Sequence, residues 1–119
     1  MTRIKNNIAF KATPAEMQKI KNACLNLSKT MAKSQTAQES FDVAEVGGKA
    51  YISASTHHGH TCFEVGMDNN KGSKAYTILT KNAKASIDDF LNSKKTLQHF
   101  AKIYDSLKEA LIRASEREV

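Results

Sequence analysis

The sequence predicts one α+β domain with two layers, in which an antiparallel β-meander of about four strands packs against one N-terminal and two C-terminal helices. Three observations lead to this fold class. Apolar residues recur at helical spacing over residues 14–31 and over 95–114, and strand-like alternation with glycine-containing turns fills residues 41–80. A chain of 119 residues can also bury a core without disulfide bonds, so we expect residues 1–119 to form a single globular domain.

The first helix is predicted to begin at Pro14. Thr13 can cap its N-terminus, and Glu16 completes a capping box three residues after the cap. The apolar stripe then advances by three or four residues at a time, through Met17, Ile20, Cys24, Leu27 and Met31. Because Cys24 lies on this stripe, we expect it to be a core residue and not a reactive thiol.

The first predicted hairpin joins residues 41–46 to residues 49–54, which both alternate between apolar and polar side chains. Residues 47–48 between them are glycines, which can adopt the positive φ values of a two-residue hairpin turn. Such a turn would pair Val46 with Lys49, Val43 with Ile52 and Phe41 with Ala54. One face of the hairpin would then be apolar and the other polar.

A second two-residue turn at His58 and Gly59 extends the same apolar face without a mismatch. It would pair His57 with His60, Thr56 with Thr61, Ala54 with Phe63, Ile52 with Val65 and Ala50 with Met67. The alternative is a three-residue loop with a bulge at Gly59, which would turn the histidines to other faces.

The remaining segments complete the predicted order of elements. Residues 7–10 are expected to form a short edge strand, residues 32–40 a flexible connecting loop, and residues 67–74 a turn before a strand over 75–80. A short helix is expected over residues 86–91. The last helix has an apolar stripe formed by Leu97, Phe100, Tyr104, Leu107, Leu111 and Ala114. Its basic residues are expected to lie off the stripe, at Lys95, Lys102, Lys108, Arg113 and Arg117.

The second hairpin would project one group of chemically active side chains from the polar face: His57, His60, Cys62 and Glu64, together with Tyr51. His57, His60 and Glu64 are the candidate catalytic residues, because imidazoles and a carboxylate can take and return a proton in phosphodiester hydrolysis. Zinc would find ligand types of the right kind here but no second cluster, so we predict no metal and no cofactor. A nucleophilic Cys62 lacks any sign of an oxyanion hole.

Positive charge is concentrated in the N-terminal third of the chain. The net charge is +6, and residues 1–40 carry seven Lys or Arg against two Glu. A positive field of this kind attracts nucleic acid, anionic lipid or an acidic protein surface, although a basic face can also serve solubility alone. The predicted partner-binding residues are Lys19, Lys21, Lys29, Lys33, Lys49 and Tyr51, with the tyrosine as a stacking group.

These patterns predict a small basic binding protein without catalytic activity. It would engage an anionic macromolecule through the N-terminal lysines and the polar sheet face. One alternative is a nuclease-like phosphodiester hydrolase that uses His57, His60 and Glu64, with or without a metal. Another is an inhibitor or adaptor that docks on a single protein complex. The sequence shows no signal peptide and no spanning apolar run, so we expect a cytoplasmic protein without a membrane partner. A homodimer is compatible with the pattern.

Overall fold

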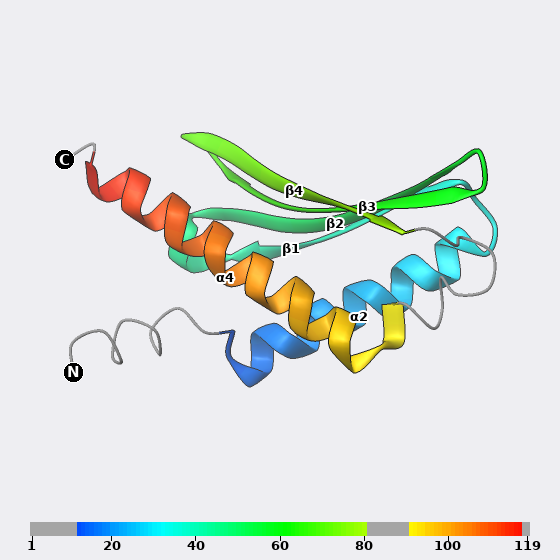
Figure 1. Ribbon diagram of the computed structural model, residues 1–119. Coiled ribbons are helices and arrows are strands. Elements are labelled where there is room, and N and C mark those ends of the chain that lie inside the picture. Colours follow the sequence, from blue (N-terminus) through cyan, green and yellow to red (C-terminus); the bar gives the residue numbers. More distant parts are fainter. Residues whose placement is uncertain (1–11, 81–90, 118–119) are drawn as a thin grey trace.

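The computed structural model describes residues 12–80 and 91–117 (Figure 1). Their elements follow the order α2 (Pro14–Met31), β1 (Thr36–Val43), η1 (Ala44–Val46), β2 (Gly48–His57), β3 (His60–Asn69), β4 (Gly72–Thr80) and α4 (Lys94–Arg117). The predicted strand over residues 7–10 lies outside the described residues, as does nearly all of the short helix predicted over 86–91. Within the described residues, one C-terminal helix and not two packs on the sheet.

The four strands form one antiparallel sheet in the order β1-β2-β3-β4, which confirms the predicted meander. Both helices lie against the same face of this sheet (Figure 1). No other element of the described ranges covers the opposite face. The two-layer α+β arrangement is therefore present, and its core lies between the helices and one side of the sheet.

Helix α2 begins as the sequence predicts. The backbone N–H of Thr13 donates to the Glu16 carboxylate at 2.9 Å, and the backbone N–H of Glu16 donates to the Thr13 hydroxyl at 3.1 Å. This capping box satisfies two amides that the helix itself leaves without partners. Four residues of the predicted stripe are buried in the core: Ile20, Cys24, Leu27 and Met31. Cys24 is therefore a core residue, as expected.

The first hairpin has a different register from the predicted one. Val43 pairs with Gly48 and not with Ile52, because residues 44–47 form a longer connection that ends with Gly47 in the left-handed conformation at φ 64°. Three predicted pairs are therefore wrong: Val46 with Lys49, Val43 with Ile52 and Phe41 with Ala54. The partner of Val43 moves by four residues along β2, an even number, so the side chains of β1 keep their predicted faces.

The second hairpin is confirmed. β2 and β3 pair His57 with His60, Thr56 with Thr61, Ala54 with Phe63, Ile52 with Val65 and Ala50 with Met67. His58 and Gly59 both have positive φ, at 52° and 78°, as a type I′ turn requires. The left-handed backbone conformation of His58 is uncommon for residues other than glycine, although asparagine, aspartate and histidine adopt it more often than the rest.

Two segments that the sequence marks as polar connections belong largely to strands. β1 begins at Thr36, so only residues 32–35 connect it to α2, and the predicted loop over residues 32–40 is shorter than expected. β1 is an edge strand whose alternate residues face water, so its first half lacks an apolar signal. β3 continues to Asn69 and β4 starts at Gly72, with the Asn69 side chain accepting hydrogen bonds within the turn.

Helix α4 completes the core with the stripe that the sequence predicts. Phe100, Tyr104, Leu107 and Leu111 are all buried against the sheet and α2. Phe100 meets Phe63 of β3 with ring centroids 6.4 Å apart. The helix layer thus packs on the apolar side of the sheet, and it leaves the opposite, polar face of the sheet open.

Candidate functional site

The open face of the sheet carries the side chains predicted to be catalytic. His57 and His60 face each other across the second hairpin, and Cys62 and Glu64 follow on the same side of β3. The intervening residues of β3, including Phe63, are buried on the helix side. Because successive residues of a strand point to opposite faces, the four side chains share the open face, as the sequence predicts.

The open face does not bring the histidines to Glu64. Glu64 lies four residues from His60 along β3, which is about 13 Å in an extended strand. Its carboxylate instead accepts a hydrogen bond from the Tyr51 hydroxyl at 3.2 Å. The three histidines of the turn are exposed, and the rings of His57 and His58 meet edge to face at 4.2 Å. The carboxylate and the imidazoles of the hydrolase hypothesis thus occupy separate places on this face.

Within residues 12–80 and 91–117, the structure contains no metal centre on this face. In those ranges, no group of three or more His, Cys, Asp or Glu side chains gathers closely enough to hold a metal ion. Both cysteines are free, with Cys62 half-buried on the open face and Cys24 buried in the core. Burial raises the pKa of the Cys24 thiol to about 12, so this cysteine stays protonated and inert near neutral pH.

Tyr51 is held in place on the open face by its two neighbours on β3. The tip of its ring lies directly over Gly66, the residue paired with it, so that a Cβ at position 66 would overlap the ring. Its hydroxyl is fixed by Glu64, and burial, followed by the negative charge of Glu64, raises the pKa of Tyr51. The ring is therefore a fixed aromatic surface that requires glycine beneath it.

The predicted partner-binding residues divide between the two sides of the molecule. Lys19, Lys21, Lys29 and Lys33 are exposed in and just after α2, on the helix side of the sheet. Lys49 and Tyr51 lie on the open face, where the Lys49 ammonium is 4.0 Å from the Asp42 carboxylate. One flat partner surface cannot contact both groups, because the sheet lies between them (Figure 1).

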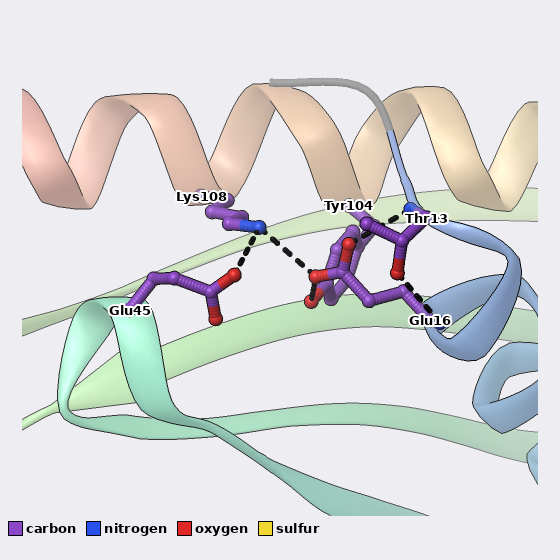
Figure 2. Close-up of polar contacts among 5 residues, drawn as sticks. All are labelled: Thr13, Glu16, Glu45, Tyr104 and Lys108. Carbon is purple, nitrogen blue, oxygen red and sulfur yellow. Dashed lines mark hydrogen bonds and ion pairs between the residues drawn. The ribbon is translucent and has the colours of Figure 1, made fainter. Parts of the chain in front are cut away.

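A buried ionic cluster joins α2, η1 and α4 (Figure 2). The Lys108 ammonium donates to Glu16 and to Glu45, each at 2.9 Å. The Tyr104 hydroxyl donates a short hydrogen bond to the same Glu16 oxygen. The side chains of Lys108 and Glu16 are only 5% and 11% exposed, whereas that of Glu45 is 54% exposed. The cluster thus holds one buried carboxylate and one buried ammonium with their partners.

These contacts control the ionisation of the cluster. Although burial alone would raise the pKa of Glu16, the hydrogen bonds from Tyr104, the Thr13 amide and Lys108 together lower it to about 2. The pKa of Lys108 is raised, because its two carboxylate partners outweigh the effect of burial. Glu16 and Lys108 are therefore an ion pair over the whole range between mild acid and alkaline pH.

The sequence predicted the capping role of Glu16 but not the burial of Lys108. Lys108 was expected off the apolar stripe of the last helix, yet the residue is only 4% exposed. Its position four residues after Tyr104, on the same side of the helix, was the available signal. The signal was weak because nothing in the local sequence shows that Glu16, 92 residues away, supplies the partner charge.

Comparisons with family models, with curated proteins and with solved structures find no match to this chain. Among the described residues, no helix is both long enough and apolar enough to cross a membrane. The class of protein therefore has to be inferred from the fold and its surfaces alone.

Proposed function

We propose that this protein is a non-enzymatic binding protein that engages an anionic macromolecule through the exposed side of α2. The observation that carries this proposal is the placement of charge on that helix. Glu16 is the only acidic residue of α2, and it is buried with Lys108. The exposed surface of the helix therefore presents Lys19, Lys21 and Lys29, and α2 itself contributes no exposed carboxylate.

The lysines of α2 are not equivalent as binding groups. The Lys19 ammonium lies 5.8 Å from the centroid of the Phe41 ring, so this side chain also covers the edge of the core. Lys21 and Lys29 are exposed, and Lys33 follows directly after the helix. Ammonium groups without fixed partners bind phosphates by releasing counterions, which gives affinity without sequence specificity. A nucleic-acid backbone is the first anionic partner to test.

The test compares two double variants that lose the same charge. Lys21→Gln with Lys29→Gln removes two exposed ammonium groups from α2, whereas Lys49→Gln with Lys71→Gln removes one from β2 and one from the turn between β3 and β4. Binding of fluorescein-labelled duplex DNA and single-stranded RNA is measured by anisotropy at several salt concentrations. We expect the α2 variant to reduce the slope of log K against log salt by about 2, because each phosphate contact contributes roughly 0.9. The sheet variant should keep the slope of the unmodified chain.

Two results would contradict the proposal in this form. Absence of binding to both nucleic acids at low salt would exclude the phosphate backbone as the partner. Equal losses in the two variants would show only a dependence on net charge, without a role for α2. An affinity capture from cell lysate, with and without nuclease treatment, separates nucleic acid from an acidic protein. Partners that are lost only with the α2 variant and retained after nuclease treatment identify an acidic protein surface as the target.

A further inference from the structure

We propose that the outer edge of β4 pairs with β4 of a second copy of this chain, antiparallel, about a two-fold axis at Tyr76. In the sheet formed by residues 12–80, β4 is an edge strand of nine residues, Gly72–Thr80. It contains no proline and no acidic residue, and Lys74 is its single charge. Edge strands that remain unpaired usually carry proline, a bulge or charged side chains, and of these features β4 has only the one lysine.

The other edge of the sheet is protected. β1 contains two carboxylates, and that of Glu39 accepts a hydrogen bond at 3.2 Å from the Asn26 amide of α2. The second carboxylate, on Asp42, is exposed and lies near Lys49. Charges of this kind and a neighbouring helix disfavour pairing with another strand. The two edges of the sheet thus differ in how strongly their charges disfavour pairing with another strand.

The backbone of β4 offers groups for pairing over its whole length. Asn69 pairs with Gly72 across a two-residue turn. The residues that flank such a turn form a hydrogen-bonded pair through their backbone N–H and C=O groups. Along β4, the even-numbered residues therefore direct their backbone groups to β3, and residues 73, 75, 77 and 79 direct theirs outward. These outward groups allow about eight hydrogen bonds in a symmetric pair of strands.

One register uses the whole strand. With Tyr76 opposite Tyr76 of the second copy, residue 73 opposes 79, residue 75 opposes 77, and outward groups meet outward groups throughout. Lys74 then opposes residue 78, so the two Lys74 positions are about 13 Å apart along the strands, beyond the Debye length of about 8 Å in physiological salt. The register therefore brings no like charges together. This self-complementarity is the reason why we assign the edge to a second copy.

Tyr76 lies at the centre of β4 and is largely exposed. It pairs with Val65, which is 3% exposed in the core, yet Tyr76 itself is 53% exposed. Where α4 reaches the start of β4, a cavity of about 220 Å³ opens between the two elements, lined in part by Lys74, Leu111 and Ala114. In the paired strands, Tyr76 of each copy would occupy a non-hydrogen-bonded position. The two rings would then lie close enough to pack on each other and to cover each other's exposed surface.

The length of the β4–β4 contact sets the expected affinity of the dimer. Nine residues give a contact line of about 30 Å, which buries less area than a standard interface of about 1,600 Å². We therefore expect reversible association in the micromolar to millimolar range. Sedimentation equilibrium from about 5 µM to about 1 mM should show the weight-average mass rising from that of one chain towards that of two. A single-chain mass over the whole range would overturn the proposal.

Two proline variants locate the interface. Ala75→Pro removes an outward amide of β4, and Ser40→Pro removes an outward amide of β1 without touching β4. We expect the β4 variant to stay monomeric and the β1 variant to dimerise like the unmodified chain. The reverse result would place the interface on β1 and refute the proposal. Circular dichroism of each variant verifies that the fold is retained.

Cross-linking tests the register independently of the proline variants. In a chain with Cys62→Ser, Tyr76→Cys would bring two cysteines to a Cα separation of about 4.5 Å, within the range of a disulfide. Lys74→Cys, two residues away on the same side, would leave about 13 Å and no cross-link. With oxidised glutathione as the oxidant, covalent dimer should form at position 76 and not at position 74. Equal cross-linking at both positions would refute this register.

Discussion

Replacement of Glu16 by glutamine should destabilise the protein by about 3 kcal/mol. Glutamine has the shape of the protonated carboxyl and can still complete the capping box, so the substitution removes mainly the charge. The pKa of Glu16 is about 2 in the folded protein, against an ordinary value of 4.5. A difference of this size corresponds to about 3 kcal/mol in favour of the ionised form. The side chain is 11% exposed, so screening by water reduces this value only slightly.

Urea unfolding of Glu16→Gln at neutral pH measures the loss directly. The matched control is Glu45→Gln, which removes the other carboxylate bonded to Lys108. Because Glu45 is 54% exposed, we expect a loss of at most about 0.5 kcal/mol from this control. A loss of less than about 1 kcal/mol for Glu16→Gln would refute the reasoning, since removal of one partner from a buried pair commonly costs about 3–5 kcal/mol.

The stabilisation by the ionised Glu16 carboxylate should depend on pH. A carboxyl whose pKa is lowered by folding stabilises the folded state fully above its unfolded pKa, near 4.5, and loses this contribution as the pH falls to about 2. The difference in unfolding free energy between the unmodified chain and Glu16→Gln should therefore shrink over that interval. A difference that stays constant down to about pH 2 would show that the charge of Glu16 is not its cause.

Two further predictions concern the open sheet face and the core thiol. Gly66→Ala should cost about 1–3 kcal/mol, because the added methyl group displaces the Tyr51 ring, and the cost should fall below about 1 kcal/mol when Tyr51→Ser is already present. Equal costs in both backgrounds, measured by urea unfolding, would contradict this steric explanation. A thiol reagent at mildly alkaline pH should modify only Cys62 in the folded protein, because Cys24 is buried with its pKa raised to about 12. Rapid modification of Cys24 without unfolding, detected by mass spectrometry of peptides, would count against its burial.

The second hairpin was predictable because two independent signals agree. The turn residues His58 and Gly59 fix one register, and the apolar residues Ala54 and Phe63 require the same one. In the first hairpin, the glycine pair suggested a two-residue turn, but only Gly47 takes the left-handed conformation, at the end of a longer connection. Local sequence does not distinguish these two uses of a glycine pair.

For the candidate residues of β2 and β3, the sequence predicted the face of the sheet on which each lies. It did not predict which candidate groups lie close together in space. Alternation in β2 and β3 correctly placed His57, Glu64 and Tyr51 on the face away from the helices. The predicted two-layer arrangement already placed α2 on the apolar side of the sheet, but the sequence interpretation still grouped the α2 lysines with Tyr51 in one partner surface. The burial of Lys108 was missed because a contact between the first and last helices leaves no local pattern.

The ionic cluster around Glu16 also affects the order in which the protein can mature. Its two buried charges, Glu16 and Lys108, lie 92 residues apart in the sequence, and Lys108 follows all four strands. During synthesis, α2 and all four strands therefore leave the ribosome while Glu16 still lacks its cation and the apolar side of the sheet lacks α4. Long-range contacts of this kind form late and slow folding. The newly made chain is thus most vulnerable to aggregation and proteolysis in the interval before α4 docks.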